Sequence, residues 1–243
     1  IMMLFIRSVF FNILFFIWTF FIVLSALPAF IFGRHWLHYA ARHWGQGVTQ
    51  LLRLVQIQVE IRGQHHLPQE SVIVASKHQS VWETTMIEFL VPDAVIILKR
   101  ELTMIPLFGH LLVKAGMISI DRSKGRNVIP QMVEGAIHAR DQGRSIFIFP
   151  EGTRTTAGER GTYRHGAYAL YKGTGLKVVP AAHNAGFFWP RRKFLKVPGK
   201  IIFEFLPAIE PGLSEQDFMK RLADTIEAAS DKLNPMKNVE KPK

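Results

Sequence analysis

The sequence predicts a layered α/β domain with an N-terminal two-helix membrane anchor, and two observations indicate this fold class. After residue 54, short apolar runs rich in Val, Ile and Phe alternate with helical stretches, which is typical of helices layered on a largely parallel or mixed sheet. Before that point, a long uncharged stretch precedes a basic and aromatic one. We therefore expect membrane-associated helices in residues 1–54 and the α/β domain in residues 55–243.

The uncharged stretch from Ser8 to Gly33 predicts a membrane helix. At about 1.5 Å per residue it is long enough to cross a hydrocarbon core roughly 30 Å thick. A signal peptide is disfavoured, because the apolar stretch is too long and bulky residues follow Pro28 where a cleavage site needs small ones. Pro28 is expected to bend or end the helix. The helix then either spans the bilayer or lies within one leaflet.

The next segment, residues 34–54, contains aromatic and cationic side chains that suit a lipid headgroup region. They are Trp36, Tyr39, Trp44, Arg34, Arg42 and Arg53. The pattern predicts a second helix at the membrane interface, although an ordinary amphipathic helix packed on the domain would show the same pattern. Basic residues directly after the first helix favour a cytoplasmic location for that end.

The apolar runs after residue 54 predict the strands of the sheet. "VQIQVEIRG" alternates apolar and polar residues over Val55, Ile57, Val59 and Ile61, as a half-buried strand does. The other runs are short and continuous, as in buried strands of an α/β sheet. They are "SVIVAS", "AVIILK", "GMISI", "SIFIFP", "KVVPAA" and "KIIFEFL".

Two segments are the clearest helices, residues 126–141 and residues 214–233. The second begins with a capping-box pattern at Ser214 and Asp217 and is stopped by Asn234-Pro235. Its apolar residues fall close to one face: Phe218, Leu222, Ile226 and Leu233. The lysine-rich end, "NPMKNVEKPK", is expected to be disordered.

Composition restricts the partners. The 243 residues include 30 Lys and Arg against 19 Asp and Glu, and the formal charge of +11 favours anionic partners such as an acidic membrane surface, phosphorylated substrates or nucleic acid. Nucleic acid is disfavoured, because the charge accompanies a membrane segment and no recognisable binding motif is present. The absence of cysteine excludes disulfides and thiolate metal sites.

His78 and Glu83 follow the strand predicted at "SVIVAS". Residues five apart on one helix are separated by about 140°, so the pair does not match the zinc ligands of an H-E-x-x-H site. If a helix begins near Ser80, His78 lies on the preceding turn, where Glu83 can orient its imidazole as a general base towards a hydroxyl. The alternative is a structural capping box, in which Glu83 binds the amide of Ser80 and does no chemistry.

Two other predicted strands also end in charged residues. "IFIFP" is followed by Glu151, Gly152 and Arg154, in which glycine lets backbone amides approach a ligand and the guanidinium suits a phosphate. "GMISI" ends in Asp121 and Arg122. The alternative for each is a turn with surface charges. A charged rim beside a membrane helix favours a phosphorylated amphiphile as ligand.

Four blocks, "KHQSVWE", "GMISIDR", "FPEGTR" and "VVPAAH", occur in the order and approximate spacing of the motifs of the glycerolipid acyltransferases. The sequence resembles this family over roughly residues 55–210, and most of all its bacterial members that make phosphatidic acid from lysophosphatidic acid. "LKRELTMIPLFGHLLVKAG", residues 98–116, resembles the segment between the family's first two blocks.

The resemblance implies a role for each matching residue. His78 is the expected catalytic base and Glu83 its orienting acid; Glu151, Gly152 and Arg154 belong to the acceptor site, and Arg122 and Lys99 help to hold the acceptor phosphate. The first block departs from the family's usual N-H-x-x-x-x-D pattern, because Lys77 stands for asparagine and Glu83 for aspartate. Glutamate is longer by one methylene, so its contact with His78 needs a slightly different helix start or rotamer.

The predicted activity is acyl transfer from acyl-CoA or acyl carrier protein to the sn-2 hydroxyl of lysophosphatidic acid, with backbone amides near Gly152 binding the oxyanion. No metal and no cofactor is implied. The expected location is the cytoplasmic face of a bacterial inner membrane. The rivals are the same chemistry on glycerol 3-phosphate or another lysophospholipid, and a catalytically silent lipid binder that uses the basic rim.

Overall fold

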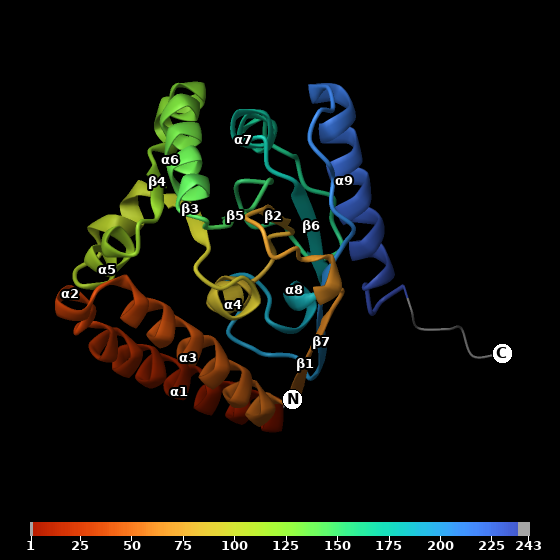
Figure 1. The fold of residues 1–243 in the computed structure, drawn as a ribbon. Coiled ribbons are helices and arrows are strands. Elements are labelled where there is room, and N and C mark those ends of the chain that lie inside the picture. Colours follow the sequence, from red (N-terminus) through yellow and green to blue (C-terminus); the bar gives the residue numbers. More distant parts are fainter. Residues whose placement is uncertain (1, 238–243) are drawn as a thin grey trace.

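The computed structural model describes residues 2–237, and these form a seven-stranded sheet between two layers of helices (Figure 1). The strand order is β1-β7-β6-β2-β5-β3-β4. In that order the strands are Ile57–Arg62, Gly199–Phe205, Val178–His183, Ile73–Ser76, Ile146–Ile148, Val95–Lys99 and Ile118–Ile120. Each apolar run that predicted a strand forms one, so the predicted layered α/β fold is confirmed.

The sheet is mixed and largely parallel. Strands β6, β2, β5, β3 and β4 all run in one direction, whereas β7 is antiparallel to β6 and β1 is parallel to β7. The carboxyl ends of the five parallel strands therefore lie along one edge of the sheet, which is where α/β sheets usually bind ligands. The charged residues that follow β2, β5, β3 and β4 all belong to this edge.

The central strands are buried on both faces, which explains why their sequences are continuously apolar. Around β2, Val72 and Val74 belong to the core on one face, whereas Ile73 and Ala75 belong to the core on the other. All four side chains are at most 1% exposed. Two separate hydrophobic cores thus hold the strand that precedes His78.

The first face of the sheet is covered by α4, α8, α1 and α3, and Figure 1 shows α1 and α3 side by side beneath the other two. Phe11 and Phe15 of α1 each make an edge contact with the Trp189 ring, with centroids 5.0 and 5.4 Å apart. The helices of this layer are α1 (Met2–Ala26), α2 (Ala29–Phe32), α3 (Arg34–Leu52), α4 (Trp82–Leu90) and α8 (Ala185–Phe188).

The second face is covered by α6, α7 and α9, and α5 lies beside α2 at one end of the sheet (Figure 1). The Ser214 hydroxyl accepts the Asp217 amide at the start of α9, as predicted, and the apolar face of that helix is buried. Helix α6 begins three residues later than predicted, because residues 126–128 belong to a preceding 3-10 segment, which is kinked at Gly125. The bounds are α5 (Phe108–Lys114), α6 (Ile129–Asp141), α7 (Gly166–Thr174) and α9 (Glu215–Lys232), with 3-10 segments η1 (Arg53–Val55), η2 (Gln64–His66), η3 (Arg100–Met104) and η4 (Arg122–Val128).

Helices α1 and α3 pack on each other and on the domain. Trp44 of α3 donates to the Thr19 hydroxyl of α1 at 3.0 Å, and Gly47 of α3 lies so close to Trp18 that an added Cβ would stand 2.3 Å from the ring. Pro28 follows the end of α1, as expected. The packed amphipathic alternative therefore describes the inner face of α3. One hydrophobic core contains residues from both sides of residue 54. The division of the chain at that residue stays a prediction.

The outer face of α1 is exposed and apolar. Met2, Phe10 and Phe16 are at least 60% exposed, and α1 is the one helix among the described residues that is long and apolar enough to cross a membrane. A continuous exposed apolar surface on a helix is typical of a contact with a membrane or a partner. The expected disorder of the lysine-rich end falls mostly on residues 238–243, which lie outside the described residues.

Candidate active site

The backbone of His78 is fixed on both sides. Lys77 still pairs with β6, because its amide donates to the carbonyl of Ala181 at 3.0 Å, and His78 is the next residue. The His78 amide donates to Glu151 Oε2 at 2.9 Å, and its carbonyl accepts the Thr155 amide at 2.8 Å. The loop after β5 thus clamps the residue that follows β2.

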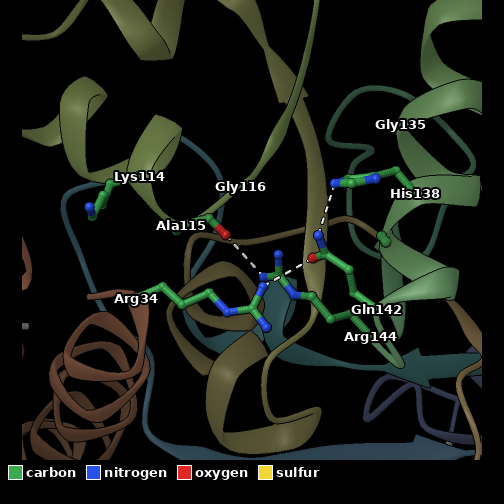
Figure 2. A pocket seen from close by; sticks show the side chains of 9 residues that line it. Arg34, Lys114, Ala115, Gly116, Gly135, His138, Gln142 and Arg144 are labelled. Carbon is green, nitrogen blue, oxygen red and sulfur yellow. Dashed lines mark hydrogen bonds between the residues drawn. The ribbon is translucent and has the colours of Figure 1, made fainter. Parts of the chain in front are cut away.

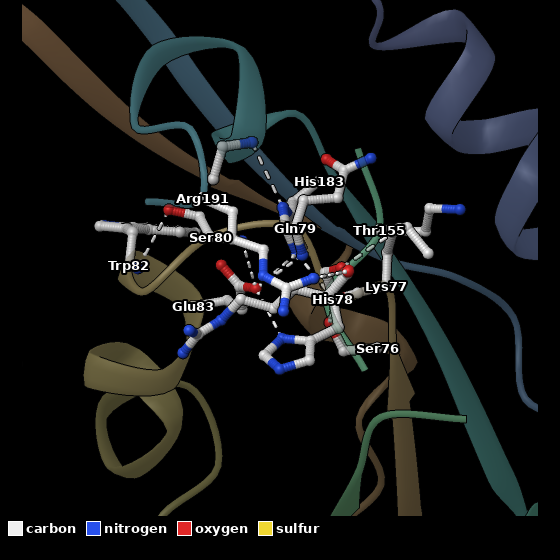
Figure 3. A network of polar contacts seen from close by, with 12 residues as sticks. Ser76, Lys77, His78, Gln79, Ser80, Trp82, Glu83, Thr155, His183 and Arg191 are labelled. Atoms are coloured by element: carbon white, nitrogen blue, oxygen red, sulfur yellow. Dashed lines mark hydrogen bonds and ion pairs between the residues drawn. The ribbon is translucent and has the colours of Figure 1, made fainter. Parts of the chain in front are cut away.

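The imidazole of His78 contacts an aromatic ring and the carboxylate of Glu83, and the latter contact is drawn in Figure 3. Nδ1 is 2.9 Å from Glu83 Oε1, and the ring stacks on Phe149 with centroids 3.8 Å apart. A carboxylate on Nδ1 fixes the hydrogen there and leaves the lone pair on Nε2. Figure 3 shows Nε2 pointing away from Glu83, and the side chain is 14% exposed. This is the geometry of an oriented general base.

Glu83 has both of the contacts that the sequence left as alternatives. The same oxygen that binds His78 also accepts the amides of Gln79 and Ser80, each at 2.8 Å. Helix α4 begins at Trp82, two residues later than expected, and from its first turn Glu83 reaches the His78 imidazole. Capping the helix therefore does not prevent Glu83 from orienting His78.

Glu83 is fully buried, and its surroundings favour the charged form. Burial alone raises its pKa, but the neighbouring imidazoles of His183 and His78 and the Ser80 amide outweigh this and leave the pKa below its ordinary value. The pKa of His183 is in turn lowered by its burial, while the Glu83 charge opposes that shift; its Nδ1 accepts the Ala185 amide and its Nε2 lies 2.8 Å from the Lys77 carbonyl oxygen. The second oxygen of Glu83 has no hydrogen-bond partner among the described residues.

Glu151 is buried beside a lysine that the sequence did not single out as functional. Lys77 Nζ lies 2.8 Å from Glu151 Oε1 and 2.6 Å from Glu227 Oε1 of α9. All three side chains are at most 8% exposed. In the sequence, the only sign of this ion pair was Lys77 in place of the expected asparagine. Its partner Glu227 lies 150 residues further along the chain, so no local pattern joins the two.

Gly152 and Arg154 occupy the turn after β5. The Gly152 amide donates to the Phe149 carbonyl at 2.9 Å, and φ is +69°, which favours glycine. In this arrangement that amide already has a partner, which counts against it as an oxyanion donor. Arg154 Nε is buried without a hydrogen-bond partner among the described residues. Burial lowers the pKa of Arg154, and the Glu83 charge opposes that shift.

Lys99 ends β3 and Arg122 follows β4, the two strands that lie beyond β5 in the sheet. With strands about 4.8 Å apart, β4 lies roughly 14 Å from β2 along the same edge. Lys99 is exposed at the end of β3, and Arg122 begins η4. Asp121 bonds to the Ser123 hydroxyl at 2.6 Å and lies 3.8 Å from Arg100. The fold places both residues on the predicted edge, and among the described contacts none links the Lys99 side chain to His78.

The opposite edge of the sheet has a pocket of about 170 Å³ with several basic side chains, shown in Figure 2. Arg144 precedes β5 and the Ala115-Gly116 pair precedes β4, so the pocket belongs to the amino ends of the strands. Arg34 from the start of α3 also lines it. None of the predicted site residues lies there.

Comparison with known proteins gives the family of this chain. The family model described as Acyltransferase matches residues 58–184, which is more than half of the chain. The chain belongs to the acyltransferase family.

Individual relatives have a more specific name. A 1-acyl-sn-glycerol-3-phosphate acyltransferase of Pseudomonas aeruginosa is 35% identical over 203 residues, which cover 78% of this chain and 79% of that protein. The mouse 1-acyl-sn-glycerol-3-phosphate acyltransferase alpha is 31% identical over 71% of this chain and 62% of its own length. A crystal structure of the Thermotoga maritima lysophosphatidic acid acyltransferase shares the fold, with a TM-score of 0.73 over 96% of this chain and 97% of that one, at 18% identity.

Proposed function

We propose that the chain transfers a fatty acyl group from a thioester donor, acyl-CoA or acyl carrier protein, to the sn-2 hydroxyl of lysophosphatidic acid, giving phosphatidic acid. The observation that supports this most is the contact of His78 Nδ1 with Glu83 at the end of β2, inside the block that matches the family. The similar Pseudomonas protein bears the name of this activity.

In the proposed reaction the acceptor itself supplies the nucleophile. His78 Nε2 accepts the hydroxyl proton while the oxygen attacks the thioester carbonyl carbon, and Glu83 stabilises the imidazolium that forms. When the tetrahedral intermediate collapses, the C–S bond breaks and the imidazolium returns its proton to the leaving thiolate. The products are an ester and a free thiol, and neither a serine nor a cysteine nucleophile is required.

The acceptor phosphate is proposed to bind along the same edge, with Arg154 as its main contact. The Nε–H of Arg154 is a buried donor without a partner among the described residues, and a guanidinium binds phosphate through a planar fork. Lys99 and Arg122 would add charge further along the edge, while Glu151 and Gly152 shape the turn. No metal is required for this role; among the described residues no group of three His, Cys, Asp or Glu could hold one.

The membrane is the proposed source of the acceptor. The inner stripe of α1 packs on the domain and its outer face is apolar and exposed, which favours a helix lying in one leaflet over one that spans. Arg34, Arg42 and Arg53 follow this helix and suit an anionic surface on the cytoplasmic side. We therefore place the enzyme on the cytoplasmic face of a bacterial inner membrane.

An acceptor panel tests the proposal. Purified protein is given one labelled acyl thioester with lysophosphatidic acid, glycerol 3-phosphate or another lysophospholipid, and the products are separated. Acylation of lysophosphatidic acid well above the others is expected. Preference for a different acceptor would reassign the substrate, and lipid binding without thioester consumption would show a silent binder instead.

A further inference from the structure

The ammonium group of Lys77 is fully buried and all of its hydrogens have acceptors. Nζ lies 2.8 Å from Glu151 Oε1, 2.6 Å from Glu227 Oε1 and 3.2 Å from the carbonyl oxygen of Glu159. A lysine has three N–H donors, so this geometry uses each of them. Lys77 is therefore held in one position.

Glu227 is the second carboxylate that contacts the buried ammonium group of Lys77. A buried cation needs a nearby anion to stay charged, and Glu227 also accepts the Tyr163 hydroxyl at 3.0 Å. Burial and the Glu227 carboxylate raise the pKa of Tyr163, so its hydroxyl remains a donor. Glu227 comes from α9, beyond the residues that match the family model.

Glu151 links the ammonium group of Lys77 to the backbone of His78. Its Oε1 bonds Lys77 while its Oε2 accepts the His78 amide at 2.9 Å. Gly161 leaves room for this side chain, since an added Cβ there would lie 2.1 Å from Oε1. The carboxylate thus has one fixed position, between the lysine and the His78 peptide.

We propose that Lys77 and Glu227 form a matched ion pair that positions Glu151 and, through it, the backbone of His78. Lys77 is then a positioning residue for the transfer reaction, and the carboxylate of α9 gives its ammonium group a second anionic partner beside Glu151. The kinetic part of this inference rests on the proposed function, whereas its structural part does not.

Three variants form a double-mutant cycle: Lys77→Met, Glu227→Gln and both together. Lys77→Met leaves two buried carboxylates without their cation, so Glu151 should move and kcat should fall by about 10²-fold, as expected for a misplaced catalytic group. Glu227→Gln keeps Lys77 paired with Glu151 and should cost less than about threefold. The double variant removes both charges and should regain about tenfold over Lys77→Met. The KM for lysophosphatidic acid should stay within about twofold throughout, because the phosphate contacts are untouched.

Amide hydrogen exchange of His78 gives a second readout that needs no activity. The bond to Glu151 should slow exchange in the wild type, Lys77→Met should accelerate it, and the double variant should restore protection. Purely additive kcat losses, or unchanged His78 exchange in Lys77→Met, would overturn the inference. A wild type that acylates nothing would instead remove the proposed function and leave the exchange result to decide.

Gly161→Ala reaches the same carboxylate without changing any charge. The added methyl group should displace Glu151, accelerate His78 exchange and lower kcat by about tenfold. Gly166→Ala is the matched control, because its Cβ meets only the flexible end of Met132 at 3.2 Å. If Gly161→Ala behaves like this control in both measurements, the position of Glu151 does not matter and the inference is wrong.

Discussion

The inner part of the site, after β2 and β5, differs from the outer part, after β3 and β4. In the inner part Lys77, Glu83 and Glu151 are at most 1% exposed, and each makes two or more polar contacts. In the outer part Lys99 is exposed and Arg100 reaches Asp121 only at 3.8 Å. The buried groups suit chemistry that needs fixed geometry, whereas the solvated charges suit attraction of an anionic substrate.

The largest effect among the supporting residues is expected for Glu83→Gln. Glutamine keeps the length and can still accept the Gln79 and Ser80 amides, but it cannot stabilise an imidazolium. We expect kcat to fall by about 10²-fold or more while Tm stays close to that of the wild type. Steady-state kinetics and a thermal melt on the same preparation measure both. Near-normal kcat would mean that Glu83 only caps α4.

Arg154→Ala is expected to have an intermediate effect that is confined to the acceptor. Loss of a charge-assisted phosphate contact should raise the KM for lysophosphatidic acid by about tenfold or more, with the donor KM nearly unchanged. Arg154→Lys should recover only part of the loss, because it restores the charge but not the planar fork. Equal increases in both KM values would argue against a phosphate contact.

Lys99→Ala should have a small effect, as expected for the exposed outer part. The acceptor KM should rise by about threefold at low salt and the difference should shrink as ionic strength increases. Titration of the substrate at two salt concentrations measures this. A loss as large as that of Arg154→Ala would show that Lys99 makes a close contact, and would weaken the contrast between the two parts.

Lys196 extends the comparison to a buried cation without a carboxylate. Its Nζ bonds the Asn12 side chain and the Phe194 carbonyl and lies 5.5 and 5.4 Å from the rings of Phe11 and Trp189. Burial lowers its pKa from 10.5 to about 8. The charged form is therefore disfavoured in the folded protein, and the cost is relieved as pH rises through about 8.

The unfolded chain keeps this proton up to about pH 10.5, so the folded protein should gain stability across that window. The test is denaturant unfolding of the wild type and of Lys196→Met at about pH 7.5, 9 and 10, which bracket the shift. Over this range the free energy of unfolding of the wild type should rise relative to that of the variant, by up to about 3 kcal/mol. Parallel pH dependence of the two proteins would contradict a shifted Lys196. Little change in activity is expected, because Lys196 lies against α1.

The strands and the inner pair could be predicted from the sequence because their signals are local. Continuous apolar runs marked strands buried on both faces, and His78 and Glu83 are five residues apart across one strand-to-helix turn. Helix α4 starts at Trp82, two residues later than the sequence predicted. Ser80 Oγ accepts the Trp82 amide and donates to the Trp189 carbonyl, and so does not cap the Glu83 amide. Local patterns thus predicted the contact but not its detail.

The remaining features depend on pairings distant in sequence. Strand order depends on which strand edges pair in the folded protein. No residue pattern predicted that β7 would run antiparallel to β6. The contact of Lys77 with Glu227 joins residues 150 apart, and α9 showed only its amphipathic face in the sequence. Phe149 belongs to an apolar run that predicted a strand, yet its stacking on His78 follows from the register of β5 against β2.

The most direct test of the account is the rate at which His78→Ala transfers a labelled acyl group to lysophosphatidic acid, beside the wild type in the same vesicles. Loss of the base should lower turnover by at least about 10²-fold while the folded variant still sediments with the membrane. Turnover close to that of the wild type would contradict a reaction in which the His78 imidazole takes the hydroxyl proton.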